Sequence, residues 1–193
     1  MRRLSILYEE LTSEELIPLV ASRDELAFSC LMARHRNTVY GIVYRFFKTP
    51  QEADDVFQEV FLKVWRSAGE YKPTAQFTTW LYTVTANQCK SELASLWRRN
   101  VRLIGSFWAE DAEERIVPFT PSTEETAANN QQAEQVRHAI GTLPAKQRLA
   151  LILSHFEGLS YAEIAGIMDC SIPAIESLLF RARHGLKKHL LVG

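Results

Sequence analysis

The sequence of 193 residues lacks the features that mark membrane, secreted and zinc-binding proteins. No apolar run is long enough to span a bilayer, and the N-terminal residues have no signal-peptide core. The three cysteines, Cys30, Cys89 and Cys170, lie far apart, and neither a C-x-x-C pair nor a His/Cys cluster suggests a metal site. We therefore expect a soluble, cytoplasmic protein with buried, reduced thiols and with neither metal nor cofactor.

Signals for enzymatic chemistry are also missing. The five histidines are scattered, and no nucleophile–base pair, metal-ligand spacing or phosphate-cradling glycine loop joins them. We predict that the chain is not an enzyme, has no catalytic residue and takes no small-molecule substrate. An enzyme with a helical DNA-binding appendage stays open as an alternative.

Strand signals are nearly absent, whereas apolar residues recur at helical spacing on both sides of one irregular segment. Long helices of the first half are predicted over residues 24–47, 51–67 and 78–98. The predicted fold class is all-α, with two small helical domains joined by a flexible linker. The predicted domains are residues 1–96 and 131–193, and the linker is the acidic, proline-containing segment 97–130.

The formal net charge of −1 conceals an uneven distribution of charge. Residues 101–135 hold two basic and seven acidic side chains, whereas residues 136–193 hold seven Lys or Arg against four Asp or Glu. The acidic middle of the chain therefore masks a basic C-terminal domain, which suits binding to nucleic acid.

The most informative stretch runs from Leu159 to Lys188. Ser160 and Glu163 form a capping box that starts a short helix, which ends before Ser171 caps a second helix. The second helix buries an apolar stripe of Ile175, Leu178, Leu179 and Ala182. A short helix, a tight turn and a longer helix with a polar and basic outer face predict a helix-turn-helix, which places its second helix in the DNA major groove. An ordinary helical hairpin with solvated charges is the alternative.

Two parts of the first domain carry unusual polar groups. The helix 51–67 has a dense polar face opposite its apolar stripe, which is either solvated or a partner contact. The following segment interleaves Tyr71, Phe77, Trp80 and Tyr82 with hydroxyl, amide and lysine side chains. Aromatic rings stack on unpaired bases, amides read their edges and lysines hold phosphates. We expect Trp80 in the core, whereas the loop residues and Asn87 suit base reading.

These motifs together resemble those of the extracytoplasmic-function (ECF) sigma factors, bacterial subunits that give RNA polymerase its promoter choice. The matching segments are Asp55-Val56-Phe57-Gln58-Glu59, then Phe77, Trp80, Leu81 and Asn87, then Leu143-Pro144, Gly158 to Ala165, and Arg181-Ala182-Arg183. They span both domains. The resemblance therefore implies a sigma region 2-like helical bundle followed by a sigma region 4-like helix-turn-helix domain.

The resemblance also implies three binding surfaces. Contact with core RNA polymerase is expected from Asp54, Asp55, Gln58, Glu59 and Lys63. Binding of the melted minus-ten promoter element is expected from Tyr71, Lys72, Phe77, Asn87 and Lys90. Binding of the duplex minus-thirty-five element is expected from Tyr161, Ala174, Glu176, Ser177, Phe180, Arg181 and Arg183.

The expected partners follow from the same resemblance. They are core RNA polymerase, promoter DNA and a regulatory anti-sigma protein, in a soluble or a membrane-anchored form. The acidic linker is expected to thread toward the active-site cleft of the polymerase, because carboxylates can occupy a basic path built for RNA phosphates.

Two positions depart from the pattern of the family. Many relatives carry basic residues where this chain has Glu176 and Leu178, so the upstream DNA sequence stays open. Glu176 can accept a hydrogen bond from cytosine or pair with Arg181 or Arg183 on the helix surface. A stand-alone helix-turn-helix regulator that binds duplex DNA as a dimer is the alternative function, although no dimerisation helix is evident.

Overall fold

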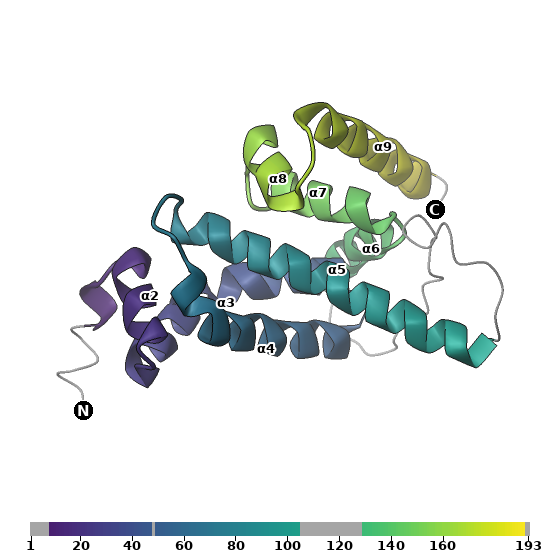
Figure 1. The fold of residues 1–193 in the computed structure, drawn as a ribbon. Coiled ribbons are helices and arrows are strands. Elements are labelled where there is room, and N and C mark those ends of the chain that lie inside the picture. The colour runs from purple at the N-terminus through teal and green to yellow at the C-terminus, as the bar shows by residue number, and fades with distance from the viewer. Residues whose placement is uncertain (1–7, 48, 105–128, 192–193) are drawn as a thin grey trace.

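The computed structural model describes residues 8–47, 49–104 and 129–191. All regular elements in these ranges are helices, in agreement with the predicted all-α fold (Figure 1). None of the described helices is both long and apolar enough to cross a membrane. Most of the predicted linker, with its expected path toward the polymerase cleft, lies outside the described residues.

After residue 12, the described part of the first domain contains five regular elements. They are α2 (Ser13–Ala21), α3 (Glu25–Phe46), α4 (Pro50–Ser67), the 3-10 turn η1 (Ala68–Glu70) and α5 (Phe77–Ile104). Capping boxes start α2 at Thr12 and Glu15 and α4 at Thr49 and Glu52, while Asp24 caps α3 by accepting from two amides of its first turn. These local hydrogen bonds set where each helix begins.

α3 lies at the centre of this domain and packs against α2, α4 and α5. Its buried side includes Val39, Ile42, Val43 and Phe46, which recur at helical spacing. α4 contributes a matching apolar stripe that includes Val56, Val60 and Val64. The apolar sides of these helices form the core of the domain and leave their polar sides facing outward.

α5 ends later than predicted from the sequence. It continues to Ile104, whereas we expected the helix to end at Arg98 and the domain at residue 96. Residues 91–104 contain neither Gly nor Pro, so no helix breaker occurs before Gly105. The first residues of the predicted linker 97–130 therefore belong to α5. The helix α6 starts at Asn129, one residue before the predicted end of the linker.

The second domain contains the predicted helix-turn-helix. Its elements are α6 (Asn129–Gly141), α7 (Ala145–His155), α8 (Tyr161–Met168) and α9 (Ile172–Leu191). As predicted, Ser160 and Glu163 form the capping box of α8, and the Ser171 hydroxyl accepts from the amide of Ala174, at 3.4 Å. Asp169 ends α8 with a φ of 54°, in the left-handed region that closes the turn.

The two domains pack against each other (Figure 1). α8 lies against α5, and α6 and α7 lie against α3. In Figure 1, α4 lies at the bottom of the molecule and α9 at the top, on opposite sides of this contact. The closed arrangement therefore leaves the outer sides of both α4 and α9 accessible.

The cysteines are free thiols in different environments. Cys89 is buried, whereas Cys30 and Cys170 are half-buried, so the prediction of buried thiols is confirmed for Cys89 alone. Burial raises the pKa of the Cys89 thiol and keeps it protonated at neutral pH.

Candidate partner and nucleic-acid surfaces

The outer face of α4 carries the five residues expected to contact a protein partner. Asp54, Asp55, Gln58, Glu59 and Lys63 are all exposed. The helix packs chiefly against other elements of the first domain, and its polar side faces away from the second domain. The structure therefore brings all five residues together on one accessible surface.

Leu62 adds an apolar side chain to this acidic face and was not predicted from the sequence. Its side chain is 41% exposed. Leu62 follows Gln58 by four residues and Asp55 by seven, which puts all three on one side of the helix. An exposed leucine among carboxylates suits a protein partner, since carboxylates repel phosphate. The spacing of Leu62 from Gln58 and Asp55 is the feature of the sequence that could have placed it on this face.

Tyr71 organises the loop of residues 71–76 between η1 and α5. Its hydroxyl donates to the carbonyl of Ala75 at 2.7 Å, and its ring lies edge-on to Phe77 and Trp80. Residues 72–76 are all exposed. The tyrosine therefore faces inward and closes the loop, while Lys72 and its neighbours face solvent.

Phe77 does not lie on this surface, which corrects its expected role in binding the minus-ten element. Its side chain is only 1% exposed and packs against the rings of His35 and Trp80. As the first residue of α5, it anchors the start of the helix in the core. The clustered aromatic residues of this segment therefore pack together beneath the loop 71–76 and support it.

The outward side of α5 is partly covered by the second domain. Asn87 is exposed. The Lys90 ammonium lies 3.5 Å from the carbonyl of Met168, the last residue of α8. A cation is favoured at this position, because the C-terminal end of a helix carries free carbonyls and partial negative charge. Lys90 is therefore engaged by the second domain in the closed arrangement.

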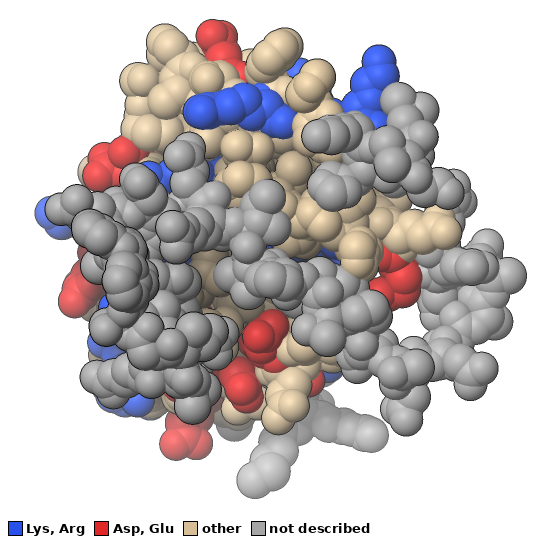
Figure 2. Space-filling model, turned by 90° about the vertical axis from the view of Figure 1, so that its right-hand side faces the viewer, with Lys and Arg blue, Asp and Glu red and all other residues tan. Residues whose placement is uncertain are grey.

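The recognition face of α9 is open. Glu176, Ser177, Phe180, Arg181 and Arg183 are exposed, and Phe180 reaches 72% exposure. Ala174 and Tyr161 are half-buried beside them, and the Arg183 guanidinium donates to the Tyr161 hydroxyl at 3.3 Å. Figure 2 shows Lys and Arg side chains near the top of the molecule, on the side where Figure 1 has α9. All seven predicted residues thus lie on or beside one face.

The departures at Glu176 and Leu178 have different structural outcomes. Leu178 is half-buried and packs against the core, so it serves the apolar stripe. Arg181 donates to the carbonyl of Ser177, at 3.4 Å. Among the described residues no ion pair joins Glu176 to Arg181 or Arg183, so this structure does not form the surface pair that was one of the two alternatives for Glu176. The Glu176 carboxylate is thus left pointing to solvent.

Arg148 joins the two domains and was not predicted from the sequence. It is 6% exposed, and its guanidinium donates to the carbonyls of Phe46 at 2.6 Å, Gly141 at 2.7 Å and Leu143 at 2.9 Å. The guanidinium also lies over the Phe46 ring. Burial lowers the pKa of Arg148 to about 10, which still keeps the side chain charged at neutral pH. One arginine thus satisfies the free carbonyls of two helix ends.

The rest of the domain contact contains further polar and ionic groups. The Tyr82 hydroxyl lies 3.2 Å from a Glu157 carboxylate oxygen, and the guanidinium of Arg45 lies over the ring of Phe156. Burial raises the pKa of Tyr82 to about 12 and raises the pKa of Glu157 above its usual value. Polar contacts of this kind are typical of domain interfaces that open and close.

No group of side chains in the described part of the chain could hold a metal ion. The surfaces above are built from exposed side chains on helices, with neither a nucleophile–base pair nor a deep polar cleft among them. Their arrangement suits binding to macromolecules, with one acidic face on α4 and one polar and basic face on α9.

Two family models match this chain in the order of its domains. Residues 31–99 match Sigma-70 region 2, and residues 133–184 match Sigma-70, region 4. The first model covers α4 and most of α3 and α5, whereas α2 lies before it. The second covers the helix-turn-helix.

Relatives match over nearly the whole chain. It is 34% identical over 181 residues to the RNA polymerase sigma-H factor of Pseudomonas aeruginosa, which covers 92% of this chain and 93% of the relative. It is 33% identical over 180 residues to the ECF RNA polymerase sigma-E factor of Escherichia coli, covering 92% of this chain and 94% of the relative.

Solved structures share the fold. CnrH in complex with the cytosolic domain of CnrY matches with a TM-score of 0.63 and 22% identity, covering 92% of this chain and 96% of that chain. The sigma factor RpoE of Bartonella quintana, solved in complex with the anti-sigma factor NepR, matches with a TM-score of 0.66 and 24% identity over 86% of this chain and 97% of that one.

Proposed function

This chain belongs to the extracytoplasmic-function RNA polymerase sigma factors, and we propose that three of its surfaces each contact a different part of the polymerase–promoter complex. α4 binds core RNA polymerase, the loop 71–76 with α5 reads the melted minus-ten element, and α9 reads the duplex minus-thirty-five element. The observation that carries the proposal is the open recognition face of α9, joined in one chain to the acidic face of α4. The factor acts in the cytoplasm and performs no bond chemistry itself.

The polymerase contact is proposed for Asp54, Asp55, Gln58, Glu59 and Lys63, with Leu62 as an apolar anchor among them. Their exposure on one side of α4 supports this role. Interfaces draw most of their free energy from a few apolar side chains that are desolvated at the centre of a polar rim. Leu62 is the side chain on this face with that character.

The minus-ten contact is proposed for Lys72, Asn87 and Lys90, with Tyr71 closing the loop and Phe77 supporting it from below. An exposed amide can read the edge of an unpaired base, and a lysine can hold the adjacent phosphate. Strand separation is driven by the capture of unpaired bases, which shifts a population without consuming a nucleotide.

The closed arrangement is incompatible with simultaneous reading of both elements. Their names place them about 25 base pairs apart, which is about 85 Å along B-DNA at about 3.4 Å per base pair. α8 lies directly against α5, so the two reading surfaces are held much closer than that. The domains therefore separate on the promoter, and a chain as long as residues 105–128 spans at most about 86 Å when fully extended.

Regulation by an anti-sigma protein is part of the proposal. The support comes from one structure of similar fold, the sigma factor RpoE of Bartonella quintana, which was solved in complex with the anti-sigma factor NepR. A partner that holds the domains together would keep Lys90 covered by α8 and prevent minus-ten reading.

Reconstitution with core RNA polymerase tests the proposed function. The purified chain should co-elute with the core enzyme and start transcription from promoters selected from random DNA. Gln58→Ala with Glu59→Ala should weaken polymerase binding, whereas Asn87→Ala should relax minus-ten choice at unchanged polymerase affinity. Failure to bind polymerase, with tight binding of palindromic duplex DNA as a dimer, would favour the stand-alone regulator instead.

A further inference from the structure

We infer that Glu14, on α2, is a positioning residue for the minus-ten reading loop, because its carboxylate caps the N-terminus of α5 where that loop ends. This inference rests on the proposed role of the loop 71–76. Glu14 lies before the segment that matches the sigma region 2 model, so neither the family motifs nor the local sequence indicates it.

The cap is a single hydrogen bond between distant parts of the chain. The amide of Phe77, the first residue of α5, donates to Oε1 of Glu14 at 2.9 Å across a separation of 63 residues. The first four amides of a helix have no acceptor within it, and a carboxylate there is favoured by the positive end of the helix. The bond is charge-assisted, which strengthens it relative to a neutral cap.

The loop itself provides no side chain that could replace Glu14. Gln76 precedes α5 and accepts from the amides of Thr79 and Trp80 through its backbone carbonyl only. Glutamine is not among the residues favoured at this position, where Ser, Thr, Asp and Asn lead. The start of α5 therefore depends on a carboxylate supplied by another helix.

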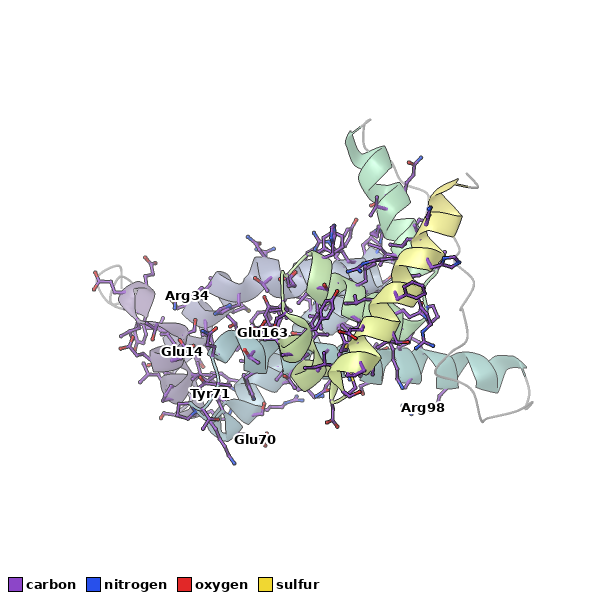
Figure 3. The ribbon with its side chains drawn as sticks, turned by 90° about the horizontal axis from the view of Figure 1, so that it is seen from above. Glu14, Arg34, Glu70, Tyr71, Arg98 and Glu163 are labelled. Carbon is purple, nitrogen blue, oxygen red and sulfur yellow. The ribbon has the colours of Figure 1, made fainter. Side chains whose placement is uncertain are left out.

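Glu14 is in turn held by a fixed helix. The neighbouring Ser13 is buried, and its hydroxyl lies 2.8 Å from Nε2 of His35 on α3. Arg34 also donates to the Ser13 hydroxyl, at 3.3 Å. These contacts tie α2 to α3, so the Glu14 carboxylate reaches α5 from a rigid base. Figure 3 shows Glu14 and Tyr71 close together, with Arg34 on the adjacent helix.

The loop is thus anchored at both ends and exposed between them. At its start, the amide of Tyr71 donates to the carbonyl of Ala68 at 3.3 Å, and the Tyr71 hydroxyl donates to that of Ala75. At its end, Glu14 fixes the amide of Phe77. Between these anchors lie the exposed residues 72–76. A loop that is already ordered loses less conformational freedom when it captures a base, which favours tight and selective binding.

The test compares Glu14→Ala, Glu14→Gln and the control Glu10→Ala in the full chain bound to core polymerase. The Glu10 side chain is exposed and makes no hydrogen bond or ion pair with the described residues. The probe is fork-junction promoter DNA with a single-stranded minus-ten element, in a matched form and with single-base changes. We expect Glu14→Ala to reduce the preference for matched DNA about fivefold, the equivalent of one helix cap, and Glu14→Gln to reduce it less, since its amide oxygen still accepts. Glu10→Ala should leave the preference unchanged.

Two further measurements separate the outcomes. Amide hydrogen exchange at Phe77 should accelerate in Glu14→Ala, while affinity for core polymerase stays within twofold of the parent chain. Unchanged base preference in Glu14→Ala, or equal losses of polymerase affinity and base preference, would overturn the positioning role. If Lys72→Ala and Asn87→Ala also leave base preference unchanged, the proposed reading surface itself is wrong.

Discussion

The two proposed DNA-reading surfaces are built in different ways. The recognition face of α9 depends on contacts within a short stretch, because the caps at Ser160, Asp169 and Ser171 all lie within twelve residues of one another. The loop before α5 depends on distant groups, since Glu14 caps the helix and α8 covers part of its outer side. The α9 face is exposed in the closed structure, whereas the outer side of α5 is partly covered and would be uncovered only if the domains separate.

This difference matches the substrates. Duplex DNA presents a regular groove that a preformed helix can enter, whereas a base becomes accessible only after strands separate. The outer side of α5 is partly covered by α8 in the closed chain. If polymerase separates the domains, this side would become accessible to a melted strand only in the polymerase complex. On the proposed function, the domain contact would keep the outer side of α5 from melted DNA until the domains separate.

The largest expected effect comes from breaking the domain contact at Arg148. Arg148→Ala leaves the carbonyls of Phe46, Gly141 and Leu143 without their donor, which we expect to lower the free energy of unfolding by about 2–4 kcal/mol. The domains should also separate, which small-angle scattering would record as a larger radius of gyration. Arg181→Ala, at an exposed arginine, is the control. An unchanged radius would mean that other contacts hold the closed form.

The next effect concerns the preformed surface alone. Phe180→Ala with Arg181→Ala should weaken minus-thirty-five binding by about tenfold to a hundredfold, the range for loss of one good base contact. Both side chains are exposed, so folding and polymerase affinity should not change. Fluorescence titration of the holoenzyme with upstream duplex DNA measures this, with Lys187→Ala as the control. A parallel loss of polymerase affinity would contradict the division of labour between α9 and α4.

A smaller effect is expected from removing a local cap. Ser160→Ala breaks the capping box of α8 and should cost about 1 kcal/mol. Amide hydrogen exchange should speed up in α8, whereas the loop 71–76 and the start of α5 should keep their protection. Faster exchange at Phe77 in this variant would show that the two surfaces are coupled through the domain contact.

The smallest effect is a pH dependence confined to the first domain. Burial, with a further contribution from Arg34, lowers the pKa of His35 below its usual 6.5, while Glu14 opposes the shift. The unfolded chain therefore binds a proton first as the pH falls below about 6.5, and the stability contributed by neutral His35 is lost. Urea denaturation at pH 7.5 and 5.5, followed by tryptophan fluorescence, measures this, because residues 129–193 contain no tryptophan.

His35→Gln should flatten that pH dependence. An unchanged pH dependence in His35→Gln would contradict the assignment of the effect to His35.

Much of the architecture could be predicted from the sequence, for identifiable reasons. The capping box of Ser160 and Glu163 joins residues three positions apart, so the local sequence indicates it. The apolar stripes and the polar face of α4 recur every three or four residues, and the helical period fixes which side chains share a face. The predicted end of α5 at Arg98 was wrong. Residues 91–104 contain no helix breaker, so the helix continues, and the acidic composition of residues 101–135 does not mark where it ends.

Individual roles that depend on distant partners could not be predicted. The pattern of aromatics placed Phe77 on the reading surface, but packing against His35 and Trp80 buries it. Glu14 lies 63 residues from the amide that it caps, and Arg148 lies 102 residues from the carbonyl of Phe46. Neither side chain differs locally from an ordinary exposed charge.

The sequence by itself determined the helices, their caps and the faces that they expose, because those properties follow from hydrogen bonds and periodicity within a few residues. Only the tertiary structure decided which domain covers Lys90, which carboxylate caps α5 after the loop 71–76, and which arginine joins the domains. Those contacts form between segments that meet only after the chain has packed its apolar sides together, so their geometry is a property of the fold.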